Sequence, residues 1–413
     1  MAKYVHPPRG MRDFLPLEQL KRSQVLGWIR STYQSHGFQE IETPALEDIQ
    51  RLTSGQGGDN EKLAFRVMKR GEELQMALAN LGEDQSDELA DLGLRFDLTV
   101  PLTRYYATNR AKLPKVFKAI QAGPVWRAER PQKGRYRQFI QCDIDIIGES
   151  SMLAEIDLLI SSLHALEAIG LNDATIRINH RVLLANLLEG LGIPEEGKPA
   201  AMIIIDKLDK IFAEGVVKEL GEKFGAKVAE TAAGWLATLQ AELETPVELQ
   251  DIFAAVESRF GKGRLRFDPT LVRGMGYYTG TIFEIEHPDS SSSIGGGGRY
   301  DGMVGRWLGE DVPAVGISIG FERAVELANI DQLVGSPANL VLVLENDSPA
   351  VIAAALKLQP MLFDHGYSVR LELRPKKLNI LLDSLAEQGF THFAGVSEDS
   401  VNMDSLVIKP IGN

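Results

Sequence analysis

The chain has 413 residues, of which 44% are hydrophobic and 24% are charged, as in an ordinary globular protein with enough apolar material for real cores. This length exceeds one typical core, so two or three domains are expected. The formal net charge of −13 does not indicate a nucleic-acid-binding protein as a whole. Any contact with phosphate must therefore come from local groups of basic residues.

The single cysteine, Cys142, excludes disulfides within the chain and a CxxC zinc site, and it is typical of a reducing compartment. The seven histidines form no HExxH or His-Cys pattern, so no metal site is predicted. The N-terminal segment lacks the apolar core of a signal peptide, and no apolar run of about 18 residues could span a membrane. We expect a cytoplasmic protein without a membrane partner.

The first part of the chain predicts one helix followed by strands. An apolar stripe at helical spacing indicates a helix over residues 17–36, with Gly37 as its C-cap. A short strand is expected at 38–44, and the polar, Gly- and Glu-rich stretch 52–91 is interpreted as a mobile flap. Further strands, expected to form an antiparallel sheet because no long helix separates the last two, are 116–122, 125–129 and 139–147.

The remainder of the chain predicts a helical segment and then two stretches with strands. Residues 155–261 are mostly helical in pattern, and 271–327 return to Gly-rich and aromatic strands before a helix that begins near Phe321. After a break at 335–337, a βαβαβ pattern indicates a small parallel or mixed sheet with helices on it. Its expected strands are 340–344, 368–371, 393–396 and 406–408. No fixed-period repeat is present.

Two neighbouring strands combine opposite charges on one face. In 139–147 the apolar side chains alternate with Gln141, Asp143 and Asp145, which alone indicates a half-buried strand with one wet face. Arg127 and Glu129 have the same alternation, so a hairpin would bring both polar faces onto one surface. Such a floor suits a zwitterionic ligand that carries phosphate.

A basic segment supports this interpretation. Residues 104–141 contain ten Lys or Arg and one acid, a local balance of +9 that favours phosphate or polynucleotide binding. Tyr136 in the loop 130–137 could stack on a base. No Walker A motif, dinucleotide fingerprint or kinase signature is present, so a phosphate site would depend on arginines. The glycines at 295–298 fit either a flexible turn or a close approach of backbone to a ligand.

Seven segments in chain order resemble class II aminoacyl-tRNA synthetases, and the histidyl-tRNA synthetase family in particular. Those similar to the class motifs 1, 2 and 3 are 37–44, 127–143 and 314–323. Those similar to signatures of the histidine family are 94–99, 131–138, 271–280 and 296–301. The family often has an acidic residue where this chain has Gly276, so that position is assigned no role.

The resemblance implies an α+β fold, with a class II synthetase antiparallel sheet flanked by helices, a helical insertion domain and a C-terminal α/β domain like the family's anticodon-binding domain. The expected domains are 1–170 and 266–332 for the two parts of the catalytic core, 171–265 for the insertion, and 339–413 for the anticodon-binding-like domain. This last segment is acidic and stops just after its last strand, without the family's usual final helix. The strength of its anticodon contact stays open.

The resemblance also implies a mechanism, in which the carboxylate of histidine attacks the α-phosphorus of ATP in line. Because two anions approach, positive charge has to be fixed in advance. Catalytic roles fall to Arg127 at the α-phosphate, Arg273 between the α-phosphate and the carboxylate, and Arg323 at the γ-phosphate. Arg135 assists, and Mg²⁺ accompanies the pyrophosphate oxygens.

The implied histidine site tests both ends of the imidazole. Its residues are Asp97, Leu98, Thr99, Gln141, Asp145, Arg273, Tyr277 and Tyr278. Asp97, Thr99 and Gln141 would hold the ammonium group, and Asp145 and Tyr278 the two ring nitrogens. Such a site can discriminate by roughly 10⁴-fold, since an apolar analogue leaves buried polar groups unpaired.

The remaining implied contacts concern adenine and tRNA. Glu129 would accept a hydrogen bond from the adenine amino group, and Phe139 would stack on the ring. Arg130, Gln132 and Lys133, in the loop between the two ATP-facing strands, would contact the acceptor end of the tRNA. The insertion domain would lie over the acceptor arm.

The implied partners are L-histidine, ATP, the histidine tRNA and a second copy of the chain, the last through motif 1 and its Pro44. The alternative is a synthetase-like regulatory subunit of ATP phosphoribosyltransferase, a non-catalytic protein. It predicts loss of the ATP arginines and of the C-terminal domain. Because Arg127, Arg273, Arg323 and that domain are all present, the sequence favours the enzyme.

Overall fold

The computed structural model describes residues 5–53, 63–81, 86–131, 134–239, 243–273, 278–306, 308–329 and 338–411. Two compact units are present, one made of Met1–Asp13 and Gln24–Ile330, the other of Phe14–Ser23 and Asp331–Asn413. In these described ranges, no helix is long and apolar enough to cross a membrane.

The described part of the larger unit is built on an eight-stranded sheet with the order β1-β5-β6-β11-β10-β9-β7-β8. The strands are β1 (Gln39–Glu40), β5 (Phe117–Trp126), β6 (Gln138–Ile147), β7 (Thr175–His180), β8 (Leu265–Phe267), β9 (Thr281–Glu286), β10 (Gly295–Arg299) and β11 (Ala314–Gly320). The inner strands pair antiparallel, and β1 and β8 add in parallel at the edges. The predicted antiparallel sheet is confirmed. β5 is one strand where two were expected, since Pro124 keeps its register opposite Ile140. β5 ends at Trp126, so the strand expected at 125–129 is too long, and Arg127 and Glu129 lie in the loop that follows.

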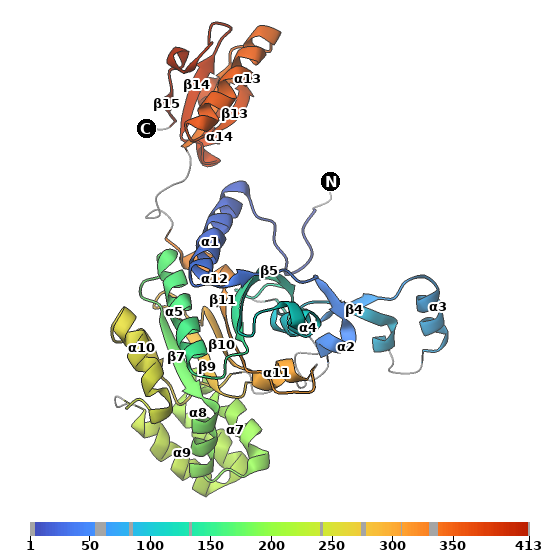
Figure 1. The fold of residues 1–413 in the computed structure, drawn as a ribbon, viewed down its shortest axis with the longest axis vertical. Coiled ribbons are helices and arrows are strands. Elements are labelled where there is room, and N and C mark those ends of the chain that lie inside the picture. Colours follow the sequence, from blue (N-terminus) through green and yellow to red (C-terminus); the bar gives the residue numbers. More distant parts are fainter. Residues whose placement is uncertain are drawn as a thin grey trace. The chain divides into compact units, whose positions relative to one another are not determined.

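One face of this sheet is apolar and packs against helices. Cys142, Ile144 and Ile146 of β6 are buried in a core with α1 (Pro16–Ser35, here from residue 24 on), α5 (Leu153–Ala168) and α10 (Gln250–Phe260). Figure 1 shows α5 beside α10 along the sheet. The apolar side of the predicted alternation in β6 is thus confirmed, and it leaves Asp143 and Asp145 on the opposite face.

A second hydrophobic core of the larger unit packs around α4 (Thr99–Asn109). It combines α4 and α11 (Asp301–Gly305) with the buried Phe117, Ile147 and Tyr300. The short helix η3 (Arg110–Lys112) follows α4. This core supports the start of α4, where the predicted ligand residues Asp97 and Thr99 lie.

The segment interpreted as a flap contains regular structure. β2 (Leu46–Asp48), β3 (Phe65–Met68) and β4 (Ala90–Leu94) form an antiparallel sheet in the order β2-β4-β3. The helices α2 (Ile49–Thr53), α3 (Gly71–Ala79) and η2 (Ser86–Leu89) lie between them in sequence. The polar composition concealed these elements because α3 buries none of its side chains.

The predicted helical segment also contains strands. Its helices α6 (Arg181–Gly190), α7 (Lys198–Ile205), α8 (Leu208–Phe224) and α9 (Ala226–Thr238) share a core of their own. Figure 1 shows α7, α8 and α9 grouped together. Short helices η4 (Glu195–Gly197) and η5 (Val247–Leu249) connect the chain there. The span 171–265 nevertheless includes β7, which pairs with β9 in the large sheet.

The described part of the smaller unit confirms the predicted βαβαβ order. Its sheet has the order β13-β12-β14-β15, in which β12 is parallel to both neighbours and β15 is antiparallel to β14. The elements are β12 (Ala338–Leu344), α13 (Pro349–Asp364), β13 (Tyr367–Leu373), α14 (Leu378–Glu387), β14 (His392–Val396), η7 (Met403–Ser405) and β15 (Lys409–Pro410). The strand expected at 406–408 is wrong by a few residues, since Leu406 and Ile408 pack on the core without pairing and the bridge forms at β15.

Candidate active site

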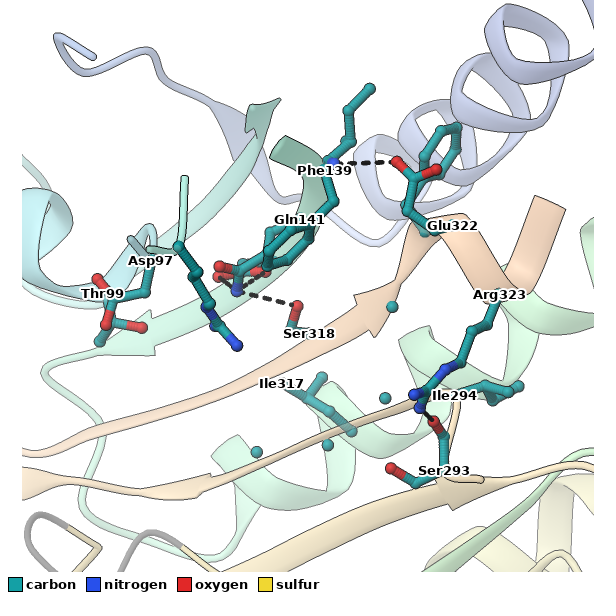
Figure 2. Close-up of a pocket in the computed structure, with 18 of the residues that line it drawn as sticks. Asp97, Thr99, Phe139, Gln141, Ser293, Ile294, Ile317, Ser318, Glu322 and Arg323 are labelled. Carbon is teal, nitrogen blue, oxygen red and sulfur yellow. Dashed lines mark hydrogen bonds between the residues drawn. The ribbon is translucent and has the colours of Figure 1, made fainter. Parts of the chain in front are cut away.

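A pocket of about 810 Å³ opens on the polar face of the large sheet. Its floor is formed by β6, β11 and β10, and its rim by α12 (Phe321–Leu327) and by the loops before α4 and between β5 and β6. Figure 2 shows side chains from these segments converging on one space. Strand pairing explains the convergence, because β6 and β11 run side by side with Asp145 opposite Gly316 and Gln141 opposite Gly320.

Two buried carboxylates lie on the floor. Asp143 and Asp145 are 4% and 3% exposed. Burial, together with Asp145, raises the pKa of Asp143 well above its usual range. Burial also raises the pKa of Asp145 to about 7, although a hydrogen bond of 2.5 Å from the Tyr300 hydroxyl to Asp145 Oδ1 partly opposes the rise. The floor therefore favours a proton or a cationic ligand group.

Two buried acceptors on the floor have no hydrogen-bond partner, namely Asp145 Oδ2 and Gln141 Oε1. The amide nitrogen of Gln141, unlike its oxygen, has partners. It lies 3.3 Å from Asp143 Oδ2 and 3.5 Å from Ser318 Oγ (Figure 2). Because unpaired buried acceptors are costly, this pair indicates a ligand with two donors.

A third carboxylate lies where α4 begins. Asp97 Oδ1 accepts a hydrogen bond of 3.1 Å from the backbone N–H of Val100. Burial raises the pKa of Asp97, while this hydrogen bond and the charge of Arg127 act against the rise. Thr99 lines the same wall, and Figure 2 shows Asp97 and Thr99 together beside Gln141. The wall can hold a ligand cation.

Arginines also line the pocket. Arg323, in the first turn of α12, donates a hydrogen bond to the backbone oxygen of Ser293. Burial and the positive charges of Arg135 and Arg273 lower the pKa of Arg323. Arg127 donates to the backbone oxygen of Phe96 at 3.1 Å. Clustered arginines of this kind suit a polyphosphate.

Arg273 is held by a shared carboxylate. Its Nη1 lies 2.5 Å from Glu284 Oε2 and 3.2 Å from the backbone oxygen of Gly295. The other oxygen of Glu284 lies 3.1 Å from Nη1 of Arg177. Arg273 can therefore turn toward a ligand without leaving Glu284 unpaired.

Glycines leave the room that the ligand needs. A Cβ at Gly296 would collide with Arg273, and one at Gly316 would collide with Asp145 Oδ1. The Gly-rich run is a strand, β10, paired on both sides, so the interpretation as a flexible turn is wrong. The alternative of a close backbone approach remains consistent with the lining of the pocket by Gly295, Gly296 and Gly297.

The side chains predicted for adenine lie at the rim. Phe139 and Glu129 both line the pocket, and Arg135 lies 3.6 Å from Glu129. The guanidinium of Arg127 lies 5.0 Å from the centroid of the Phe139 ring. An aromatic ring beside an acceptor and a guanidinium can hold a purine.

Most residues predicted for the two small ligands come together in this pocket. They are Asp97, Thr99, Arg127, Glu129, Arg135, Phe139, Gln141, Asp145, Arg273, Tyr278 and Arg323. Leu98 does not line it, because its side chain is buried and its backbone oxygen accepts from Gln121 at 2.9 Å. Arg130 is exposed outside the pocket. Tyr277, Gln132 and Lys133 lie outside the described residues.

Sequence reasoning missed several lining residues. Tyr300 received no role although it falls in the segment 296–301, which had been singled out, and Ser318 and Glu322 fall within the motif 3 segment. The basic run is also less continuous than its count suggests, since Arg104 pairs with Glu47 and Lys118 with Asp157.

Comparisons with known proteins point to one family. A family model described as histidyl-tRNA synthetase matches residues 10–324. The chain is 50% identical over 434 residues to the histidine–tRNA ligase of Leifsonia xyli subsp. xyli, covering 100% of this chain and 99% of that one. It is 42% identical over 413 residues to the probable histidine–tRNA ligase of Tropheryma whipplei, covering 94% of each.

Solved structures share the fold. The histidyl-tRNA synthetase from Nostoc sp. PCC 7120 matches with a TM-score of 0.77 and 27% identity, over 99% of this chain and 97% of that one. A protein of Bacillus halodurans C, described as an ATP phosphoribosyltransferase regulatory subunit/histidyl-tRNA synthetase, has a TM-score of 0.73 at 20% identity, over 92% and 96%. The latter likeness shows the fold alone.

Proposed function

The chain belongs to the histidyl-tRNA synthetase family, and from that premise we propose how its pocket performs the reaction. As a histidine–tRNA ligase it is an aminoacyl-tRNA synthetase that uses ATP to join histidine to tRNA. In the first step an oxygen of the histidine carboxylate forms a bond to the α-phosphorus. The bond from this phosphorus to the bridging oxygen breaks, and pyrophosphate leaves with the electron pair.

The observation that carries the proposal is that one pocket is lined both by aspartates and by arginines. The arginines Arg127, Arg273 and Arg323 receive the triphosphate. Arg127 is assigned to the α-phosphate, Arg273 to the α-phosphate and the attacking carboxylate, and Arg323 to the γ-phosphate with help from Arg135. Fixed cations stabilise charge that grows in the transition state without the cost of reorganising solvent.

The aspartates receive the amino acid. Asp97, Thr99 and the free oxygen of Gln141 accept from the ammonium group, and Asp145 Oδ2 accepts from an imidazole N–H. Tyr278 is assigned to the other ring nitrogen, while Glu129 and Phe139 hold adenine. In the second step a ribose hydroxyl at the 3′ end of the tRNA attacks the carbonyl carbon and gives its proton to the adenylate's own phosphate. The bond from the carbonyl carbon to the phosphate oxygen breaks, and AMP leaves with the electron pair.

Mg²⁺ is assigned to the pyrophosphate oxygens only. In the described part of the chain, no group of three or more His, Cys, Asp or Glu could hold a metal ion. Glu322, next to Arg323, already accepts from the N–H of Ile140 at 3.1 Å and pairs with Arg12. These residues do not fit a metal site of the protein's own, so no step is derived through the ion.

The other units receive proposed roles by family membership. We assign the core of α6–α9 to the insertion domain predicted at 171–265, and residues 339–413 of the smaller unit to the anticodon-binding-like domain. The catalytic core then comprises 1–170 and 266–332. The single cysteine, buried in β6, suits the reducing cytoplasm that we assign as the compartment.

The regulatory-subunit alternative is less well supported, because relatives that are 50% and 42% identical are named as ligases. ATP–pyrophosphate exchange tests the proposal. Exchange should require histidine and should not occur with any other amino acid. Histidine binding without exchange, together with activation of a phosphoribosyltransferase, would favour the alternative.

A further inference from the structure

We propose that the N-terminal segment is a working part of the ATP site, because Arg12 holds the loop between β5 and β6 against the start of α12. This inference deepens the proposed function and depends on it. Arg12 does not line the pocket, so it is a positioning residue that acts through its neighbours.

The backbone of the segment is fixed to the loop. The N–H of Arg137 donates to the backbone oxygen of Gly10 at 2.7 Å, and Met11 N–H donates to Pro8 at 2.9 Å in a turn. Gly10 has a φ of +83°, and a Cβ there would lie 3.0 Å from Cγ of Arg137 and 3.1 Å from Cβ of Pro131. The turn therefore requires glycine, and two residues later Arg12 lies over the loop.

Arg12 makes two contacts from this position. Its guanidinium carbon lies 3.4 Å from the centroid of the Tyr136 ring, which is a stacked cation–π geometry. It also forms an ion pair with Glu322, whose side chain is 9% exposed. One side chain thus joins the β5–β6 loop to α12.

Glu322 in turn connects Arg12 to β6 through a hydrogen bond. Its Oε1 accepts from the N–H of Ile140 at 3.1 Å (Figure 2), one residue past the point where β6 stops pairing with β11. Ile140 stands between Phe139 and Gln141, and Glu322 stands next to Arg323. A buried carboxylate needs both partners, and removing one leaves an uncompensated charge. Arg12 accordingly sets the spacing between the proposed adenine and γ-phosphate contacts.

One face of Tyr136 is covered by Arg12, which changes the role expected for that ring. The sequence indicated a ring free to stack on a base. The structure instead assigns the ring to Arg12 on one side, while the residue lines the pocket. Loss of Arg12 should therefore affect the nucleotide end of the pocket and spare the floor at Asp145.

The test compares Arg12→Ala with Arg9→Ala, an exposed arginine on the same segment. In ATP–pyrophosphate exchange by the full chain, Arg12→Ala should raise the KM for ATP about tenfold, the effect of losing one charge-assisted contact. The Kd for histidine, measured without ATP, should change less than twofold, and Arg9→Ala should resemble wild type.

Double-mutant cycles exclude a purely structural effect. Arg12→Ala combined with Tyr136→Leu, and separately with Glu322→Gln, should show non-additive KM changes for ATP. If Arg12→Ala fails to fold, Arg12→Lys should fold, keep the charge next to Glu322 and lose the planar stacking, with a smaller rise in KM. Equal losses for both ligands, additive cycles, or a normal KM for ATP in Arg12→Ala would overturn the inference. Absence of histidine-dependent exchange in wild type would instead overturn the proposed function.

Discussion

At the scale of single residues, the pocket uses three aspartates in different environments. Asp97 has a backbone N–H as partner, Asp145 has the Tyr300 hydroxyl, and Asp143 lies against the amide of Gln141. The strand alternation predicted that Asp143 and Asp145 share a face. It could not predict Tyr300, because that hydrogen bond joins residues 155 positions apart and depends on the folding of β10 onto the sheet.

Asp145→Asn should weaken histidine far more than ATP. The substitution changes an unpartnered acceptor on the floor and leaves the arginines that line the pocket in place. We expect a loss of at least about tenfold in histidine affinity, as for other charge-assisted contacts, and little change for ATP. Isothermal titration calorimetry measures both. Equal losses for both ligands in Asp145→Asn would contradict the assignment.

The same residue predicts a pH dependence of stability. Because the pKa of Asp145 is raised to about 7, above its value in the unfolded chain, the native state binds this proton more tightly. The resulting stabilisation is complete below the unfolded pKa and is lost as the pH rises toward 7. Thermal unfolding of wild type and Asp145→Asn should be measured from pH 5 to 8.5. The unfolding temperature of the wild type should fall relative to that of the variant up to about pH 7. A constant difference across this range would contradict the predicted titration.

Arg273→Ala should impair chemistry more than binding. Glu284 keeps its ion pair with Arg177, so the fold should tolerate the change. A charge placed for the transition state acts on the chemical step, and its loss typically costs about 10²-fold or more. Single-turnover adenylate formation measures this step directly. A rate close to wild type, with ATP and histidine saturating, would remove Arg273 from its role.

At the scale of elements, long regular patterns were predictable and short pairings were not. The helix at 17–36 and the β5–β6 hairpin follow from local periodicity, and both are confirmed. β7 was hidden because six residues between helices carry a weak signal, although Ile176 and Ile178 alternate and are buried. β15 was misplaced because a two-residue strand is defined by its partner β14 and not by its own sequence.

At the scale of the whole molecule, the proposed assembly is a homodimer. β1 lies at the edge of the large sheet and leads into Pro44, which motif 1 resemblance assigns to a two-fold interface. Isologous dimers are the commonest assembly of soluble oligomers. Light scattering at micromolar concentration should give twice the chain mass of 45.4 kDa. A fully active monomer at that concentration would refute the prediction.

The distribution of charge over the molecule bears on how tRNA is recognised. The β5–β6 loop is basic, whereas residues 339–413 carry six Lys or Arg against nine Asp or Glu. Phosphate contacts depend on such local charge, and base contacts on hydrogen-bonding groups. Recognition is therefore expected at the acceptor end, through the loop, more than at the anticodon.

Two substitutions in the loop should separate these contributions, since an amide can read a base edge and a lysine can supply only charge. Gln132→Ala should slow transfer to tRNA and leave ATP–pyrophosphate exchange near wild type. Lys133→Ala should weaken tRNA binding and reduce the slope of log affinity against log salt by roughly one. Removal of residues from Asn339 onward should slow transfer less than it would in an enzyme that relies on the anticodon, provided that the dimer survives. If both loop variants charged tRNA normally while that deletion abolished charging, recognition would lie in the C-terminal unit, because no loop contact would then contribute to the transfer step.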